Sequence, residues 1–316
     1  MEIIKTKRLT KSFDKVVALS GIDLTVMKGE IFGLVGPDGA GKTTMIRLLT
    51  SVMMPTSGDG WVDGSHIVRD AEAIKEKIGY MSQKFGLYGD LTVLENIHFY
   101  SEIYGVPRSK KNEQAEKLLT YMDLYRFKDR RADALSGGMK QKLGLACALI
   151  HTPKVLFLDE PTNGVDPISR REFWHILYEL HKKETTIFLS TAYMDEAERC
   201  GSVAFMYRGQ IMAHGSPEYL KSHLKGIILE VRCQAPRKTL LGLREFLGSD
   251  CVKLFGNRIH IYIYAENPGH SLQEVKELLE KLKLGNYEIR ESQPSLEDVF
   301  MSLMKEREKE DEDVRY

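Results

Sequence analysis

Apolar and polar residues follow two patterns along the first two thirds of the chain. Short, nearly unbroken apolar runs predict buried strands, and longer stretches with apolar residues three or four positions apart predict helices. The predicted strands lie at 2–9, 16–26, 31–35, 78–83, 155–158 and 186–190, the helices at 43–50 and 168–183, and a hairpin at 203–213. Strands that alternate with helices are typical of an α/β fold.

Residues 92–150 differ from this pattern because they lack clear strand signals. They contain three helical stretches, at about 92–104, 109–123 and 138–150. Thr92 followed by Glu95 is a helix-start signature for the first of them. We therefore predict a helical subdomain, at about residues 85–150, inserted in the α/β domain.

The last third of the chain has a different order of elements. It reads β-α-β-β-α-β followed by a helix, which predicts a small α+β domain of ferredoxin-like type over 225–306. The last helix is predicted to begin at Ser295, with Glu297 as its capping-box partner. We expect the charged residues 307–316 to be a frayed helix end or a disordered tail. The first domain would then occupy residues 1–224.

Composition narrows the functional classes. The 45 lysines and arginines balance the 45 aspartates and glutamates, so the charge does not favour a nucleic-acid groove. No apolar run approaches the roughly 18 residues that a membrane-crossing helix needs, and the first residues lack the apolar core of a signal peptide. We expect a cytoplasmic protein that reaches a membrane only through a partner. Four scattered cysteines lack metal-ligand spacing, which favours buried or indifferent thiols.

The clearest chemical signal lies between the strand at 31–35 and the helix at 43–50. Its residues are Gly36, Pro37, Asp38, Gly39, Ala40, Gly41, Lys42, Thr43 and Thr44. They fit the phosphate-loop pattern G-x-x-x-x-G-K-[S/T]. Glycines let backbone N–H groups approach phosphate oxygens, and the helix N-terminus adds partial positive charge. Lys42 would reach the β- and γ-phosphates, and the Thr43 hydroxyl would ligate Mg²⁺.

Two carboxylates follow the strand at 155–158. Neighbouring side chains on a strand point in different directions, so Asp159 can hold Mg²⁺ while Glu160 faces the γ-phosphate as general base. The alternative is a pair of solvated acids in a turn. Gln83 ends another predicted strand. A glutamine there can offer its amide to a metal or water at the carboxyl edge of the sheet.

Two further signals are weaker. Ser136 precedes two glycines and a helix, which indicates either a second anion site or simple helix capping. Phe13 lies upstream of the phosphate loop, where it could stack on a nucleotide base or pack in the core. The sequence leaves both choices open.

Taken together and in this order, the phosphate loop, Gln83, an L-S-G-G run and an L-D-E-P-T run resemble the ATP-binding subunits of ABC transporters. The resemblance covers residues 1 to about 220. The runs at 86–96, 193–198 and 294–300 resemble the drug- and multidrug-exporter ATPases of that family. Those subunits carry one nucleotide-binding domain and a small C-terminal accessory domain in each chain.

The resemblance implies a role for each candidate residue. Phe13 would stack on adenine, and residues 36–44 would wrap the triphosphate. The implied Mg²⁺ ligands are Thr43, Gln83 and Asp159, and the implied catalytic residues are Glu160, Gln83 and Lys42. The implied signature motif, which covers ATP on the opposite subunit, is Leu135, Ser136, Gly137, Gly138 and Met139. Asp166 would cross to that opposite subunit.

Two residues depart from the family pattern. Met139 replaces a glutamine, which we expect to be tolerated because the phosphate contact uses Ser136 and glycine N–H groups. Ala192 stands where the family usually has a histidine that contacts the γ-phosphate. Losing one preorganised donor costs about 3 kcal/mol, or about a hundredfold in rate. We therefore expect tight nucleotide binding and slow hydrolysis.

The resemblance also implies partners. Two ATP-binding subunits, identical or different, would bind ATP head to tail beneath separate membrane permeases, on the cytoplasmic face of the cell membrane. One alternative is a hydrolysis-impaired regulatory subunit paired with a competent ATPase. Another is a soluble ABC ATPase that acts on ribosomes or DNA, but such proteins usually carry two ATP domains or basic inserts. The transported substrate is not encoded in this chain.

Overall fold

The computed structural model describes residues 1–316 except 85, 225, 249–250, 264–271, 282–286 and 314–316. The chain divides into two compact units, which we call the first unit, Met1–Pro217, and the second unit, Glu218–Tyr316. Each unit has its own hydrophobic core.

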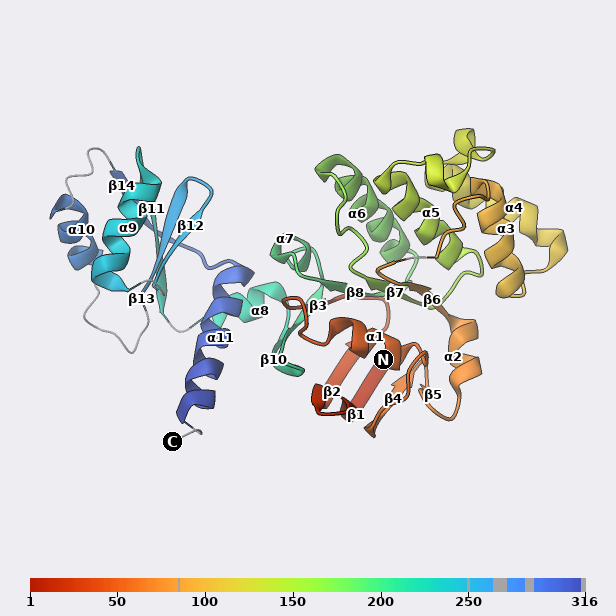
Figure 1. The fold of residues 1–316 in the computed structure, drawn as a ribbon, viewed down its shortest axis with the longest axis horizontal. Coiled ribbons are helices and arrows are strands. Elements are labelled where there is room, and N and C mark those ends of the chain that lie inside the picture. Colours follow the sequence, from red (N-terminus) through yellow and green to blue (C-terminus); the bar gives the residue numbers. More distant parts are fainter. Residues whose placement is uncertain (85, 225, 249–250, 264–271, 282–286, 314–316) are drawn as a thin grey trace. The chain divides into compact units, whose positions relative to one another are not determined.

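A six-stranded sheet forms the centre of the first unit (Figure 1). Its order is β10-β9-β3-β8-β7-β6, and every neighbouring pair is parallel except β9 and β10. The strands are β3 (Ile31–Val35), β6 (Ile78–Met81), β7 (Val155–Asp159), β8 (Thr186–Thr191), β9 (Ser202–Tyr207) and β10 (Gln210–Gly215). All residues of β3, β7 and β8 are buried, which is why they read as continuous apolar runs.

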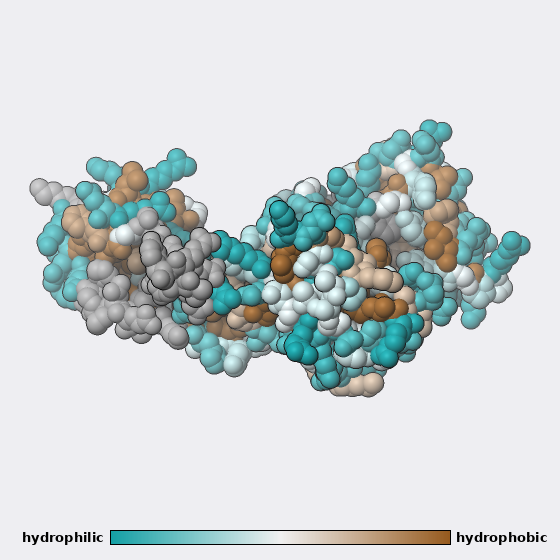
Figure 2. All heavy atoms as spheres, turned by 60° about the horizontal axis from the view of Figure 1, so that its bottom comes forward, coloured by the Kyte–Doolittle hydropathy of each residue, from teal (hydrophilic) through white to brown (hydrophobic). Residues whose placement is uncertain are grey.

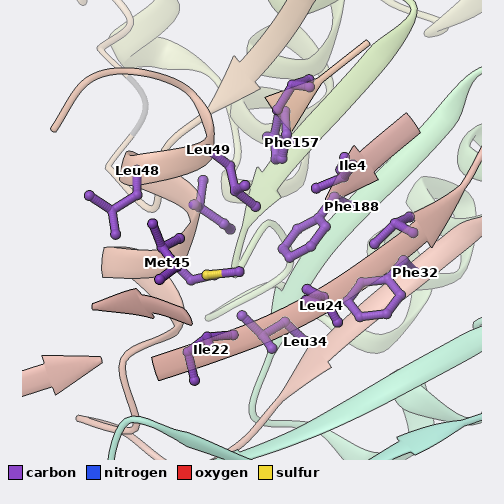
Figure 3. Packing of buried hydrophobic residues seen from close by; sticks show 14 of the residues in the cluster. Ile4, Ile22, Leu24, Phe32, Leu34, Met45, Leu48, Leu49, Phe157 and Phe188 are labelled. Carbon is purple, nitrogen blue, oxygen red and sulfur yellow. The ribbon is translucent and has the colours of Figure 1, made fainter. Parts of the chain in front are cut away.

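A second, antiparallel sheet lies on one side of this layer, in the order β2-β1-β4-β5. Its strands are β1 (Glu2–Phe13), β2 (Val16–Met27), β4 (Ser57–Val62) and β5 (Ser65–His66). Helix α1 (Lys42–Leu49) packs against both sheets, as Figure 3 shows for Met45 and Leu49 beside Phe188 and Leu34. The core thus holds rigidly the helix that follows the phosphate loop.

Helices cover the other side of the six-stranded sheet (Figure 1). They include α3 (Val93–Ile103), α4 (Arg108–Tyr121), α5 (Gly137–Leu149), α6 (Pro167–Lys182) and the short α7 (Met194–Ala197), with 3₁₀ turns η1 (Tyr125–Phe127) and η2 (Ala132–Ala134). The three helices predicted between 92 and 150 are confirmed as α3, α4 and α5. Thr92 and Glu95 form a reciprocal capping box at α3. Helix α2 (Ala71–Lys77) was not predicted. Only its residue Ile74 is buried, so its sequence lacks the repeated apolar positions that indicate a helix.

The second unit contains an antiparallel sheet in the order β12-β13-β11-β14. Its elements are α8 (Pro217–Ser222), β11 (Ile227–Cys233), α9 (Pro236–Leu247), β12 (Val252–Phe255), β13 (Arg258–Ile263), α10 (Leu272–Lys281), β14 (Tyr287–Ser292) and α11 (Leu296–Asp313). Its core joins side chains of the sheet to side chains of α9 and α10, such as Leu243 and Val275.

The expected capping partner of the last helix is wrong. The capping-box partner of Ser295 is Asp298, not Glu297: the Ser295 N–H donates to Asp298 at 2.7 Å, and the Asp298 N–H donates to the Ser295 hydroxyl at 3.2 Å. The box needs a spacing of three residues from the cap, which Asp298 provides. The helix continues to Asp313, in line with the helix-end alternative for residues 307–316.

The surface seen in Figure 2 is mainly hydrophilic, with apolar residues in scattered patches. Among the helices that the structure describes, none combines the length and the apolar character that crossing a bilayer would require.

Candidate active site

The phosphate loop joins the end of β3 to the start of α1, and two of its positions accept only glycine. A Cβ on Gly36 would lie 2.1 Å from the Met206 carbonyl oxygen. Gly41 has a φ of 108°, and a Cβ there would lie 2.6 Å from the Ala18 carbonyl oxygen. The loop is therefore pressed against neighbouring backbone, with its N–H groups at the N-terminus of α1.

Lys42 is only 4% exposed and points back along the loop. Its ammonium donates to the carbonyl oxygens of Gly36 at 2.8 Å and Pro37 at 3.0 Å. It also lies 3.0 Å from Oε1 of Glu160. A buried cation held in this way is ready to exchange the carboxylate for an anionic phosphate oxygen.

Asp159 ends β7 and is 1% exposed. Its Oδ1 accepts hydrogen bonds from Ser190 at 2.7 Å and Thr43 at 3.1 Å. Its Oδ2 is buried without a hydrogen-bond partner in the described part of the chain. Burial raises the pKa of the Asp159 carboxyl, although the two hydroxyl donors oppose the rise. A buried carboxylate oxygen that lacks a donor fits a Mg²⁺ ligand.

The described residues contain no group of three or more His, Cys, Asp or Glu side chains that could hold a metal ion by itself. The donor set around Asp159 is a carboxylate and the Thr43 hydroxyl. Mg²⁺ typically takes one or two protein oxygens and completes its shell with water and substrate phosphates. The residues present therefore fit a metal ion that arrives with a nucleotide.

Glu160 follows Asp159 in the left-handed backbone region, with a φ of 49°. Its Oε2 accepts from the Gln83 amide at 2.9 Å and the Asn163 amide at 3.3 Å, while its Oε1 faces Lys42. Three donors thus hold the carboxylate that the sequence assigns as general base. Gln83 lies beyond the end of β6 at Met81, so the strand predicted for residues 78–83 is shorter than expected.

Residues 38–44 of the phosphate loop, Gln83 and Glu160 line a pocket of about 520 Å³, whereas Gly36, Pro37 and Asp159 do not line it. The structure thus brings the phosphate loop, Gln83 and Glu160 together. Two further segments, which the sequence did not predict, also line the pocket. The lining residues are Val16, Val17, Ala18, Asp38, Gly39, Ala40, Gly41, Lys42, Thr43, Thr44, Gln83, Glu160, Arg208 and Gly209. The further segments come from the start of β2 and from the β9–β10 turn. Only the sheet topology brings them close, so no local signal marks them.

The remaining candidate residues do not line this pocket. Phe13 is 43% exposed, which excludes the core-packing alternative and leaves its ring accessible beside Lys11. Ser136 is the N-cap of α5, where its hydroxyl accepts from the Met139 N–H at 3.3 Å. Leu135 is buried behind it.

The N-termini of α5 and α6 lie side by side. A Cβ on Gly138 would lie 2.4 Å from the Ser169 hydroxyl oxygen. Asp166 caps α6, where it accepts from the N–H groups of Ile168 and Ser169 at 3.0 Å each. Ser136, Gly137 and Asp166 are exposed there, whereas Gly138 is buried between the two helices, and none of them lines the pocket at the phosphate loop.

Sequence reasoning also missed a polar network behind Glu160. Ser190 pairs with Asp159 in the register of β7 and β8, and its hydroxyl accepts from the Glu160 N–H at 3.0 Å. Ala192 is exposed just after β8. A polar residue at the carboxyl end of the neighbouring parallel strand is the signal that could have identified Ser190.

Comparison with known proteins places these features in a family. Residues 19–163 match the family model described as "ABC transporter". The daunorubicin/doxorubicin resistance ATP-binding protein DrrA of Streptomyces peucetius is 30% identical over 311 residues, which cover 95% of this chain and 92% of DrrA. This chain belongs to the ABC transporter ATP-binding family, in its drug-resistance type. The resemblance inferred from the motifs is confirmed.

Other relatives agree with this assignment. The probable multidrug ABC transporter ATP-binding protein YbhF of Escherichia coli is 42% identical over 220 residues, which cover 70% of this chain but 38% of YbhF. Among solved structures, an ATP-binding subunit of an ABC transporter matches with a TM-score of 0.64 and 27% identity, over 70% of this chain and 92% of that one. The ATP-binding cassette MJ0796, a dimer in a post-hydrolysis state with ADP and Pi, matches with a TM-score of 0.62 and 25% identity, over 67% and 98%.

Proposed function

We propose that this chain is the ATP-binding subunit of an exporter, which couples ATP binding and hydrolysis to transport by separate membrane permeases. The observation that carries the proposal is the pairing of a buried phosphate-loop lysine with Glu160, beside a carboxylate oxygen of Asp159 that lacks a donor. A nucleoside triphosphate with its Mg²⁺ would supply phosphate oxygens to pair with the Lys42 ammonium and a cation to pair with the Asp159 carboxylate.

In the proposed reaction, Lys42 and the loop N–H groups bind the β- and γ-phosphates. Thr43, Asp159 and Gln83 would hold Mg²⁺, which neutralises phosphate charge when it is bound. When Lys42 turns to the phosphates, it releases Glu160, whose carboxylate then takes a proton from the attacking water. Phe13 is accessible for stacking on adenine.

The proposal includes a second ATP-binding subunit in a head-to-tail arrangement. Ser136, Gly137 and Asp166 are exposed at the adjacent N-termini of α5 and α6. The N-terminus of α5 favours an anion, whereas that of α6 is already capped by the Asp166 carboxylate, so a phosphate group of ATP on the opposite subunit is a suitable occupant at α5. MJ0796 has been solved as a dimer. The permease partners and a position on the cytoplasmic face of the membrane are part of the same proposal, supported by the drug-resistance type of the relatives.

A hydrolysis-impaired regulatory subunit in a heterodimer is the second candidate function, and Ala192 is the observation that favours it. Its methyl group cannot donate a hydrogen bond to the γ-phosphate. The loss of one such donor lowers turnover by about a hundredfold. Restoring the imidazole by Ala192→His should therefore raise turnover, and unchanged turnover would remove this explanation of a slow site.

The first experiment measures steady-state ATPase activity and Mg-ATP binding of the purified chain, with Glu160→Gln as the control. Turnover that Glu160→Gln abolishes would support a self-sufficient homodimeric engine. Tight binding with turnover no higher than that control would support the heterodimeric regulatory subunit. Absence of Mg-ATP binding would contradict both candidates.

The second unit is proposed to be an accessory domain of ferredoxin-like topology. Its element order and its sheet order β12-β13-β11-β14, with antiparallel neighbours, support this assignment. We propose residues 1–224 and 225–306 as the two domains, and the helical subdomain at about 85–150 within the first.

A further inference from the structure

A small pocket lies beside Glu160, on the side where Ala192 follows β8. Its volume is about 120 Å³, which is room for several water molecules. Its lining residues are Asp38, Glu160, Thr162, Asn163, Thr191, Ala192 and Tyr193. The pocket therefore touches the phosphate loop, the predicted general base and the segment that lacks the histidine.

Two polar side chains of this pocket form a chain of hydrogen bonds that ends on the base. The Tyr193 hydroxyl donates to the Asn163 amide oxygen at 3.4 Å. The Asn163 amide nitrogen donates to Oε2 of Glu160 at 3.3 Å. Both distances are at the long end of the hydrogen-bond range, as is common for catalytic contacts that tighten only when substrate binds.

A buried carboxylate joins the two segments that carry this chain. Glu196 is 1% exposed and accepts hydrogen bonds from the hydroxyls of Thr162 and Thr191. Thr162 lies next to Asn163, and Thr191 also accepts from the Tyr193 N–H at 3.0 Å. Glu196 thus ties the loop after Glu160 to the segment after β8.

The ring of Tyr193 is held from the other side by α6. The Arg170 guanidinium carbon lies 4.5 Å from the centre of the ring, within the range of a cation–π contact. Arg170 also approaches Glu196 at 3.8 Å. The position of the Tyr193 hydroxyl therefore rests on a helix and a buried acid, and not on the loop alone.

We propose that Asn163 and Tyr193 are positioning residues that orient Glu160 for ATP hydrolysis, a task that a histidine at position 192 would otherwise share. This inference rests on the proposed function and deepens it. In the step concerned, the water oxygen bonds to the γ-phosphorus while Glu160 takes the water proton. The bond from that phosphorus to the bridging oxygen breaks, and its electron pair leaves on ADP. Asn163 fixes the Glu160 oxygen, and Tyr193 fixes Asn163.

The test removes the Tyr193 hydroxyl oxygen by Tyr193→Phe. One hydrogen bond contributes about a tenfold change in rate, so kcat should fall about tenfold, with KM for ATP changed less than about twofold. Tyr125→Phe removes the same atom from a tyrosine in η1, far along the chain from the pocket, and should leave both constants unchanged.

A second variant tests whether Tyr193 acts through Asn163. Asn163→Ala should lower kcat at least as much as Tyr193→Phe does. The double variant should have the same kcat as Asn163→Ala alone.

The Ala192→His background separates positioning from folding. With the histidine restored, Tyr193→Phe should lower kcat less than about twofold, because the imidazole shares the task. If Tyr193→Phe lowered kcat equally in the parent chain and in the Ala192→His variant, Tyr193 would only maintain structure, and the proposal would be overturned. So would a Tyr193→Phe variant with the kcat of the parent chain.

Mg-ATP binding, measured by equilibrium dialysis on the same preparations, distinguishes the two proposals. If the parent chain binds Mg-ATP but turns over no faster than Glu160→Gln, Asn163 and Tyr193 do not orient a working base, and this inference fails while nucleotide binding stands. If the chain does not bind Mg-ATP, the proposed function itself fails. If Tyr193→Phe lowered kcat about tenfold in the parent chain but not in the Ala192→His variant, both the proposed function and this inference would be supported.

Discussion

The buried carboxylate at the candidate site of the first unit and the buried carboxylates in the sheet of the second unit are held in opposite ways. In the first unit, Asp159 has one oxygen without a hydrogen-bond partner among the described residues, and burial raises its pKa. In the second unit, Glu230 is just as inaccessible, at 2% exposure. It accepts from three arginines, at 2.8 Å from Arg232, 3.2 Å from Arg258 and 2.8 Å from Arg290. Burial pushes the pKa of Glu230 up, but the arginines outweigh it and lower the pKa.

Asp298 repeats the second pattern. It accepts from the Tyr262 hydroxyl and from the N–H and hydroxyl of Ser295, and it lies 3.5 Å from His260. Burial pushes its pKa up, yet these partners lower it. A buried negative charge needs compensation. Where the chain supplies it, the acid stabilises the fold; where the chain does not, the acid is available to a ligand.

The largest expected effect comes from neutralising the uncompensated acid. Asp159→Asn should reduce Mg-dependent ATPase activity at least about a hundredfold, because a charged ligand to the cation is lost. It should not lower the free energy of unfolding, because the amide removes the cost of burying a charge. ATPase assays and thermal unfolding followed by tryptophan fluorescence test this. A variant that is much less stable and still active would break the comparison.

Neutralising the compensated acid Glu230 should have a smaller effect, and this effect should be on stability and not on activity. Glu230→Gln should destabilise the second unit by about 1–2 kcal/mol, less than a fully buried pair would lose, because its arginine partners are about half exposed. Amide exchange in β11 and β13 should quicken. Both tryptophans, Trp61 and Trp174, lie in the first unit and provide an internal reference.

Glu288→Gln is the matched control for that variant. Glu288 is exposed and lies opposite Arg232 on the neighbouring strand. Its substitution should change stability by less than about 0.5 kcal/mol. Equal effects of the two substitutions would mean that burial of Glu230 has no special role.

The smallest effect is a difference in acid sensitivity. The pKa values of Glu230 and Asp298 are lowered in the fold, so their contribution to stability is present above pH about 4 and is lost as pH falls through the folded values. The pKa of Asp159 is raised, so acidification removes a cost from the first unit. Below pH about 4 protonation of Glu230 and Asp298 should therefore weaken the second unit, whereas protonation of Asp159 relieves a cost at that site.

Amide exchange of second-unit peptides, compared with tryptophan fluorescence over the same pH series, measures this difference. Glu230→Gln should flatten the pH dependence of the second unit. A Glu230→Gln variant whose second unit keeps the pH dependence of the parent chain would contradict the assignment of Glu230 as a compensated acid.

Local chemistry was readable from the sequence because it depends on short spacings. The phosphate loop, the Thr92–Glu95 capping box and the Ser136 cap each need only a few neighbouring residues, and the structure contains all three. The prediction at Ser295 was wrong because it placed the partner two residues after the cap, whereas the capping box needs a spacing of three, which Asp298 provides.

The sequence alone thus determined the family, the strands that form the six-stranded sheet and the carboxylates at the end of β7. Only the tertiary structure decided which groups those carboxylates meet. The register of β7 and β8 pairs Ser190 with Asp159, and the packing of α5 on α6 brings the Ser169 side chain into contact with Gly138. Burial of Glu196 ties the loop of Glu160 to Tyr193. Such contacts join residues far apart in the chain, so no local pattern encodes them; they exist only once the sheet order is formed.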